Sequence, residues 1–299
     1  MKRFQLKAKD QYKLSVHIFP ADQPKAVVQI IHGMEEHQER YEDFAAFLCQ
    51  NGYTVVTSDM RGHGMDAADL GFFKEKNGYL ALISDQIRIR KFIAMQYPSL
   101  PVHLFAHSMG TIISRVLLQT HAADYKKVVL SGYPNFQKGA YAGLFISSIL
   151  QKLHGPKYKS AFLQNSSVGI FNKAIKEPKT EVDWICSNPE TVESYQNDPY
   201  CGIGFTCSAF HDLYRLVIQM HNPKAYKNVP ENLPLLMLCG KEDPCVGKEK
   251  GMADSCQVLS AAGFHQIKQI TYPDMRHEIL NEVNHQLVYQ DILNFLNNP

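Results

Sequence analysis

The 299-residue chain lacks the features that would direct it across or into a membrane. Residues 1–10 include basic side chains, but no apolar stretch follows them, and a secretory signal needs such a stretch. No segment approaches the roughly 20 consecutive apolar residues of a membrane-spanning helix. We therefore expect neither a secretory signal nor an integral membrane segment, and we expect a cytoplasmic protein.

The chain also has no large excess of positive or negative side chains. The formal net charge is +2, and no basic residues gather into a stripe. Nucleic-acid binding usually requires such a stripe, so the sequence argues against nucleic acid as a partner. The seven cysteines are odd in number and scattered, which favours free thiols in a reducing compartment over a disulfide framework.

Patterns that bind metals or cofactors are missing as well. His32 and His37 are five residues apart, which is not the i, i+4 spacing that places two ligands on one helical face. Cys201 and Cys207 lack a second pair at zinc-ligand spacing. Neither a phosphate-binding glycine loop nor a dinucleotide fingerprint occurs. We predict no metal and no cofactor, and nothing in the sequence sets an oligomeric state.

Hydrophobic residues make up 45% of the chain and charged residues 20%, which is enough apolar material for a large core. Short apolar runs alternate with helical patterns, and this alternation predicts an α/β fold with a mainly parallel central sheet flanked by helices. The predicted strands are 12–19, 26–31, 53–58, 102–105, 127–131, 235–239 and 267–272. The predicted helices are 40–50, 84–97, 111–120, 247–262 and 282–296.

The alternation breaks between residues 134 and 230. This stretch is irregular and rich in aromatic, Asn, Pro and Gly residues. It follows one predicted strand and precedes the next, so we expect an inserted cap over the active-site edge of the sheet. The core would then comprise residues 1–133 and 231–299.

The most informative segment places a serine at a strand-to-helix turn. Residues 105–110 read Phe-Ala-His-Ser-Met-Gly, directly after a short apolar run and before a helical pattern. Such a turn lifts Ser108 Oγ clear of the sheet and aims the Met109 amide at a developing oxyanion. The usual pattern is Gly-x-Ser-x-Gly, and Ala106 is the smallest available departure from it.

Three further positions complete a hydrolytic constellation. The strand at 26–31 ends in His32-Gly33-Met34, where the Met34 amide can supply a second oxyanion donor. Asp243 and His277 each follow a later predicted strand, so the chain order is Ser, Asp, His. All would meet at the carboxyl edge of the parallel sheet, where open α/β sheets hold their ligands.

Asp274 competes with Asp243 for the acidic position. We prefer Asp243 because it follows a separate strand and can approach the imidazole from the side opposite Ser108. Asp274 follows Pro273 and is typical of a turn.

The chain resembles the monoacylglycerol lipase and bacterial lysophospholipase branch of the α/β-hydrolases, from about Leu14 to Leu296. The resemblance implies that Ser108 is the nucleophile, His277 the general base and Asp243 the orienting acid. It also implies that Met34 and Met109 donate to the oxyanion through their amides. The segments that carry it are His32 to His37, Asp59-Met60-Arg61-Gly62-His63-Gly64, His107-Ser108-Met109-Gly110, Gly240 to Pro244 and Arg276-His277-Glu278.

The implied activity is hydrolysis of a carboxylic ester through an acyl-enzyme, with a monoacylglycerol or lysophospholipid as substrate. A short-chain carboxylesterase stays open as an alternative, as does a carbon–carbon bond hydrolase or peptidase on the same fold. A non-catalytic ligand-binding relative is disfavoured by the intact set of Ser108, Asp243 and His277. We expect a small-molecule or lipid ester as the partner.

The sequence says least about the substrate pocket. Residues 139–150 are apolar and uncharged, and they form either a helix packed inside the cap or a lid that lines an acyl channel and touches lipid surfaces. Cys245, two residues after Asp243, is expected near the mouth of the site. The candidate pocket residues are Tyr133, Phe136, Leu144, Phe145, Trp184 and Phe205, with Phe171 and Phe210 as further aromatic candidates.

Overall fold

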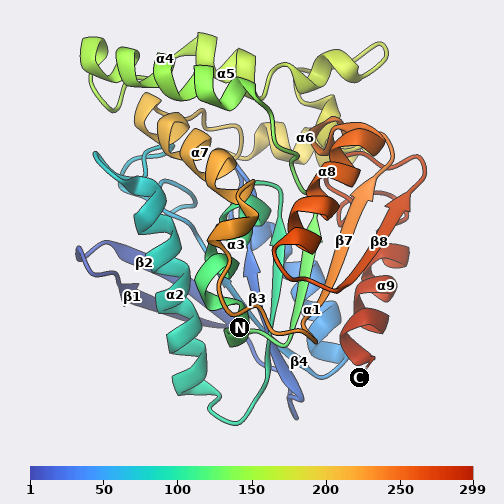
Figure 1. The fold of residues 1–299 in the computed structure, drawn as a ribbon. Coiled ribbons are helices and arrows are strands. Elements are labelled where there is room, and N and C mark those ends of the chain that lie inside the picture. The colour runs from blue at the N-terminus through green and yellow to red at the C-terminus, as the bar shows by residue number, and fades with distance from the viewer. Residues whose placement is uncertain (299) are drawn as a thin grey trace.

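A computed structural model describes residues 1–298 and contains one eight-stranded sheet, drawn in Figure 1. The strand order is β1-β2-β4-β3-β5-β6-β7-β8. The strands from β4 to β8 in this order pair in parallel, whereas β2 is antiparallel to both β1 and β4. The strand bounds are β1 Lys2–Lys7, β2 Lys13–Phe19, β3 Ala26–Ile31, β4 Tyr53–Ser58, β5 Val102–His107, β6 Lys127–Ser131, β7 Pro234–Gly240 and β8 Gln266–Tyr272.

Burial along the strands explains why the central ones were easy to predict. Every residue of β3, β4, β5 and β6 is buried, because helices cover both faces of the sheet. The edge strands β1 and β8 are largely exposed; in β1 only the alternate residues Phe4 and Leu6 are partly buried. The sequence analysis did not predict β1, since its lysine-rich edge pattern gives little apolar signal.

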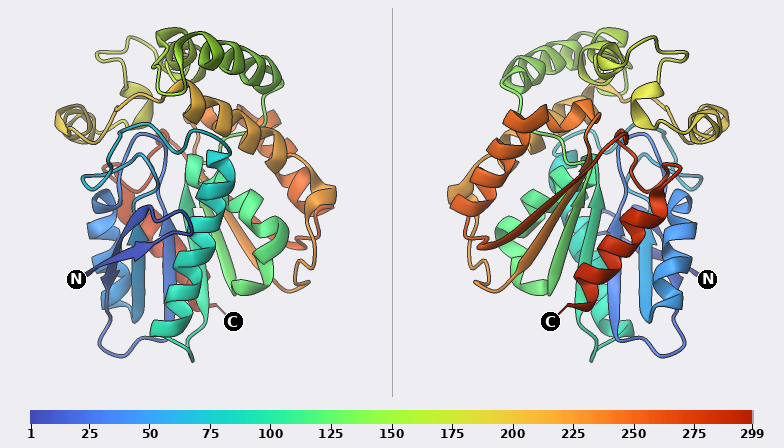
Figure 2. Two further views of the ribbon diagram at one scale, coloured as in Figure 1. Left: turned by 90° about the vertical axis from the view of Figure 1, so that its left-hand side faces the viewer. Right: turned by 90° about the vertical axis from the view of Figure 1, so that its right-hand side faces the viewer.

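Helices pack on both faces of the sheet, as the two side views in Figure 2 show. Helices α1 (Glu42–Gln50) and α9 (His285–Asn297) lie on one face. Helices α2 (Gly78–Gln96), α3 (Met109–His121) and α8 (Lys248–Ala261) lie on the other face. The predicted fold class, a mainly parallel sheet flanked by helices, is confirmed.

Four helices lie in the segment between β6 and β7, above the carboxyl ends of the strands (Figure 1). They are α4 (Gly139–His154), α5 (Ala161–Ser167), α6 (Pro189–Asn197) and α7 (Cys207–Met220). The sequence analysis read most of this segment as irregular, and that reading was wrong for α5, α6 and α7. Side chains cap these three helices: Ser160, Asn188 and Thr206 each accept a hydrogen bond from a first-turn amide.

Helix α7 connects this segment to the body of the protein. Its buried residues, including Phe210 and Leu216, belong to the same apolar cluster as α2, α3 and one face of the sheet. Helix α4 packs on α7 in turn, as Gly143 of α4 sits against the Tyr214 ring. Helix α4 is therefore anchored to the body of the protein through α7.

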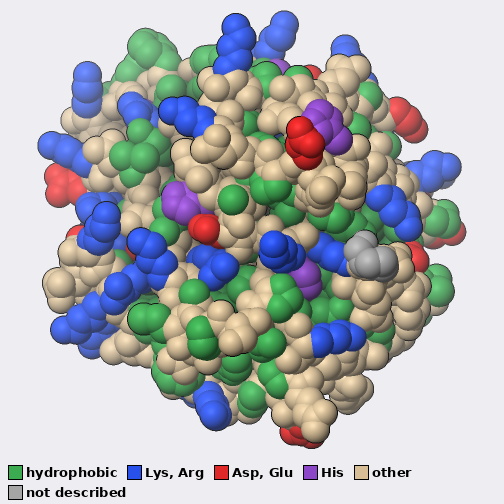
Figure 3. Space-filling view, turned by 60° about the horizontal axis from the view of Figure 1, so that its bottom comes forward, with side chains coloured by type: hydrophobic (Ala, Val, Ile, Leu, Met, Phe, Trp, Pro, Cys, Tyr) green, Lys and Arg blue, Asp and Glu red, His purple; other side chains and the backbone are tan. Residues whose placement is uncertain are grey.

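The lower face of the molecule, shown in Figure 3, carries Lys and Arg side chains spread among hydrophobic and neutral groups. Within residues 1–298, none of the helices is both long enough and apolar enough to cross a bilayer.

Candidate active site

Ser108 occupies a sharp turn between β5 and α3. Its backbone has φ 49° and ψ −121°, a conformation that L-residues rarely adopt, and α3 begins at the next residue. The following Gly110 packs tightly: a Cβ there would lie 2.3 Å from the Ile31 carbonyl oxygen. Ala106, which replaces the usual glycine, is fully buried within β5. The turn therefore forms with alanine at that position.

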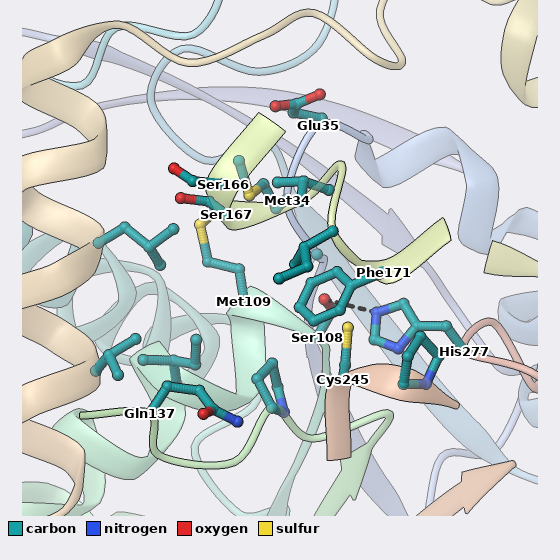
Figure 4. A pocket seen from close by; sticks show the side chains of 18 of the residues that line it. Met34, Glu35, Ser108, Met109, Gln137, Ser166, Ser167, Phe171, Cys245 and His277 are labelled. Atoms are coloured by element: carbon teal, nitrogen blue, oxygen red, sulfur yellow. Dashed lines mark hydrogen bonds between the residues drawn. The ribbon is translucent and has the colours of Figure 1, made fainter. Parts of the chain in front are cut away.

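The structure brings Ser108, Asp243 and His277 together. His277 Nε2 lies 2.8 Å from Ser108 Oγ, the contact drawn as a dashed line in Figure 4. His277 Nδ1 lies 2.9 Å from Asp243 Oδ2. Because the carboxylate can only accept, Nδ1 carries a proton and Nε2 is free to accept one from the serine hydroxyl. The second carboxylate oxygen of Asp243 accepts the Cys245 amide at 2.8 Å, which fixes its orientation.

Burial and charge act in opposite directions on His277. Burial lowers its pKa, but the charge and hydrogen bond of Asp243, helped by Glu278 and Glu36, raise the pKa above the ordinary value. The rings of Trp184 and His107 pack against the imidazole, at centroid distances of 4.9 and 4.7 Å. The imidazole is thus held by two neighbouring rings and by hydrogen bonds at both nitrogens.

Asp274, the alternative acid, does not reach the imidazole. It is exposed and sits in a turn with φ 57°, in the left-handed region that Asp and Asn tolerate better than most residues.

Met34 and Met109 flank the serine and line the same cavity (Figure 4). Met109 is the first residue of α3, where amides have no partner within the helix. Met34 follows Gly33, where a Cβ would lie 3.0 Å from Ser108 Cβ, so the loop passes very close to the serine. Both predicted oxyanion donors therefore belong to backbone next to Ser108.

A buried ionic cluster braces this arrangement, and the sequence analysis gave no role to its members. Arg40 donates to both carboxylate oxygens of Glu278 at 2.6 Å and to Glu36 at 2.9 Å. Glu36 in turn accepts the Gly33 amide at 2.5 Å. Because Glu278 directly follows His277, one guanidinium ties the Met34 loop to the loop that carries the imidazole.

The Asp59 to Gly64 turn supports the loop after β3, which carries Met34. Asp59 accepts from Gln38, and Arg61 pairs with Asp85 and Asp10. His63 Nε2 accepts the amide of Glu35 at 3.3 Å. Through Gln38 and the Glu35 amide, this turn is hydrogen-bonded to the segment that follows β3.

His32 is a second bridging histidine. It donates to the Gly33 carbonyl at 2.8 Å and accepts the Met60 amide at 2.9 Å. Burial lowers its pKa to about 3, so the ring stays neutral and keeps both hydrogen bonds.

Ser108 opens into a cavity of about 690 Å³. Helices α4, α5 and α7 supply much of its apolar wall, and the loops after β3, β6, β7 and β8 supply its floor. Its volume lies within the range of roughly 300–1,000 Å³ that is typical of small-molecule sites. Ala142 and Ile146 come from the stretch 139–150, for which a lid that lines an acyl channel was one of two interpretations. Lining residues that the sequence did not indicate include Ile112, Leu163, Leu213 and Val217.

Of the six candidate pocket residues, Trp184 lines this cavity, as does the further candidate Phe171. Within residues 1–298, the other five lie outside its lining. Tyr133 and Phe205 are buried in the main core, and Phe136 stacks on His221 at 4.0 Å. Phe145 is 68% exposed on the outer face of α4, and Leu144 is half-buried beside it. The further candidate Phe210 is also a core residue.

Cys245 lines the cavity next to Asp243. Burial and the neighbouring Asp243 carboxylate raise the pKa of this thiol well above its usual value. The thiol is therefore protonated and a weak nucleophile.

Two groups of side chains within residues 1–298 place metal-type donor atoms within 4.8 Å of one another. One is Asp243, Cys245 and His277, which the hydrogen bonds above already account for. The other is His37, Asp198 and Cys201, in which His37 and Asp198 form a direct hydrogen bond of 2.7 Å.

Comparison with known proteins agrees with this geometry. Residues 22–284 match the profile of a family described as serine aminopeptidase, S33. A monoacylglycerol lipase of Mycolicibacterium smegmatis is 24% identical over 279 residues, covering 93% of this chain and 90% of that protein. Phospholipase YtpA of Bacillus subtilis is 23% identical, covering 90% and 94%.

Among solved structures, a thermostable carboxyl esterase from Bacillus coagulans in complex with glycerol superposes with a TM-score of 0.92. It is 26% identical to this chain, and the match covers 99% of this chain and 97% of that one. The family match spans most of the chain, and the expected resemblance is confirmed. The chain belongs to the serine aminopeptidase S33 family, within the monoacylglycerol lipase and lysophospholipase branch of the α/β-hydrolases.

Proposed function

We propose that this protein cleaves carboxylic esters of long-chain acids through an acyl-enzyme formed on Ser108. Its family and relatives make it a carboxylic ester hydrolase. The observation that carries the mechanism is the continuous hydrogen-bonded row from Ser108 through His277 to Asp243, opening into one large cavity. It provides a nucleophile, a base within reach of its proton, and an acid that orients the base.

In the first half-reaction, Ser108 Oγ attacks the ester carbonyl while its proton moves to His277 Nε2. The amides of Met34 and Met109 donate to the oxyanion, and Asp243 stabilises the imidazolium. Collapse of the tetrahedral intermediate breaks the bond to the alcohol, which leaves with the proton from His277. A water molecule then repeats the sequence on the acyl-enzyme and releases the acid.

The substrate class that we propose is a monoacylglycerol or lysophospholipid. The apolar wall from α4, α5 and α7 suits one long acyl chain, and relatives are named monoacylglycerol lipase and phospholipase. We further propose that residues 134–230 form the cap, with α4 contributing its inner face, including Ala142 and Ile146, to the acyl channel.

The test is labelling and turnover of the full-length protein. A fluorophosphonate probe should label the wild type, and hydrolysis of 1-acylglycerols should be faster with long acyl chains than with acetate. Absence of labelling would contradict the acyl-enzyme mechanism. A preference for acetate over long chains would instead support the short-chain carboxylesterase alternative.

The outer face of α4 suggests where the protein meets lipid. Tyr141, Phe145, Ile149 and Leu153 recur every four residues and are 41–70% exposed, so they form one apolar stripe. Exposed lysines lie near it in the sequence: Lys138 precedes it, Lys152 adjoins Leu153, and Lys157 follows it and pairs with Asp69. We propose that this stripe makes transient contact with anionic lipid surfaces.

Phe145→Asp is therefore expected to weaken co-sedimentation with vesicles that contain phosphatidylglycerol. It should also slow hydrolysis of monoacylglycerol held in those vesicles, while hydrolysis of a soluble acetate ester stays unchanged. Leu287→Asp is the matched control, because Leu287 is 62% exposed on α9, away from the cap. Equal effects of the two substitutions would show that the α4 stripe has no special role.

A further inference from the structure

Helix α3 carries a cation deep inside the protein. Arg115 is 0% exposed and does not line the cavity beside Ser108. None of its three guanidinium nitrogens has a hydrogen-bond partner within residues 1–298. Buried charged groups in proteins are almost always paired, so this guanidinium is exceptional.

The charge of Arg115 lacks a counterion in direct contact. Burial lowers the pKa of the guanidinium, but an arginine keeps its proton in a protein. The Asp254 carboxylate of α8 attracts it at longer range, while both oxygens of that carboxylate contact His221 Nε2 at 3.1 Å. A buried charge without a close partner strongly destabilises a fold, so a counterion is needed here.

A second donor without an acceptor lies beside the guanidinium. Tyr226, in the segment between α7 and β7, is next to Arg115, and its buried hydroxyl has no hydrogen-bond partner within residues 1–298. Ser255, which follows Asp254 on the buried face of α8, has an unpaired hydroxyl as well. Arg115 and Tyr226 therefore bring N–H and O–H donors together with no acceptor between them.

The surroundings decide which acceptor fits. Tyr133 and Tyr226 pack in the main apolar core, and the Tyr226 ring meets Phe264 edge-on at 5.9 Å. Complete burial excludes a large ion, and the Asp254 charge in the neighbourhood disfavours an ion with more than one negative charge. A small ion with a single negative charge satisfies both conditions, and its attraction to the guanidinium is strong in such apolar surroundings.

We propose that Arg115 and Tyr226 form a buried binding site for a small monovalent anion, of the chloride type, which joins α3 to the segment before β7. The anion accepts hydrogen bonds from the guanidinium and from the phenol hydroxyl, and it supplies the missing negative charge. Because α3 begins directly after Ser108, the ion stabilises the helix that presents this serine without touching a substrate.

The test is thermal unfolding of the full-length protein at fixed pH and ionic strength, with sodium chloride replaced stepwise by sodium gluconate, whose anion is too large for the site. Chloride should raise the melting temperature of the wild type by about 3 °C or more, and the rise should saturate as the site fills. Arg115→Met removes the charge and keeps a long apolar side chain, so this variant should lose the saturable rise.

Arg88→Met is the matched control, because Arg88 is an exposed arginine of α2 and its variant should keep the wild-type response to chloride. Tyr226→Phe removes only the hydroxyl, and should increase the chloride concentration that gives half the rise by about threefold or more. A wild type that responds to chloride no more than Arg115→Met does would overturn the inference.

Crystals of the wild type grown with bromide in place of chloride locate the ion directly. Bromide scatters anomalously, and we expect an anomalous peak in contact with the Arg115 guanidinium. Ordered water alone at this position would overturn the inference. Because this measurement uses the unaltered chain, it is decisive even where Arg115→Met does not fold.

Discussion

Replacing Ser108 with alanine is expected to lower kcat on any ester by about a million-fold, because the nucleophile of a Ser-His-Asp unit has no substitute. The serine hydroxyl contacts His277 Nε2 at 2.8 Å, and removal of its Oγ leaves no atom to form the acyl-enzyme. Steady-state hydrolysis of a p-nitrophenyl ester measures the loss, and fluorophosphonate labelling should disappear with it.

Ser114→Ala is the matched control for that substitution. Ser114 is a buried serine of α3, the helix that begins directly after Ser108, and its hydroxyl has no hydrogen-bond partner within residues 1–298. Its replacement should leave turnover close to that of the wild type, and both variants should unfold near the wild-type temperature. Substantial residual turnover in Ser108→Ala, with labelling retained, would contradict the proposed mechanism.

The site residues that the sequence predicted are marked by patterns of a few consecutive residues. A buried parallel strand followed by a small-residue turn marks Ser108, because the strand is buried throughout and Gly110 admits no side chain. Asp243 and His277 likewise follow strands β7 and β8. Since parallel strands end at one edge of the sheet, their order in the chain was enough to expect the three side chains together.

The buried ionic cluster could not be predicted in this way. Arg40 and Glu278 are 238 residues apart, and in the sequence each is simply a charged residue. Only the folded chain shows that the guanidinium joins the Met34 loop to the His277 loop. Removing one partner is nevertheless expected to destabilise the fold by about 3–5 kcal/mol, because the remaining charge would be buried without a counterion.

The substrate pocket could not be predicted either, for a different reason. Aromatic residues in an inserted segment can face the cavity, the core or solvent, and the choice depends on how the helices pack. Phe171 and Trp184 face the cavity, whereas Phe205 packs in the core with His63 and Phe73. Much of the cavity wall consists instead of aliphatic side chains of α4 and α7.

The second large loss of activity is expected from a substitution of Asp243, the acid that orients His277. Asp243→Asn is expected to lower kcat by about 10⁴-fold while leaving the fold intact. The asparagine oxygen can still accept the Cys245 amide, but its NH₂ group would then face His277 Nδ1. The imidazole would have to carry its proton on Nε2, where it can no longer accept the proton of Ser108.

The pH dependence gives an independent readout of the same substitution. Burial lowers the pKa of His277, and Asp243 is the main group that raises it again. Removing this charge therefore lowers the pKa, and because only the neutral imidazole acts as a base, the acid limb of the kcat/KM profile should move to lower pH.

Asp274→Asn provides the matched control, since it makes the same chemical change only three residues from His277. Asp274 is exposed and has a φ of 57°, a conformation that asparagine adopts as readily as aspartate. Its variant should retain near wild-type turnover and an unshifted pH profile. If Asp274→Asn were the more damaging of the two substitutions, Asp274 rather than Asp243 would be the acid that orients His277.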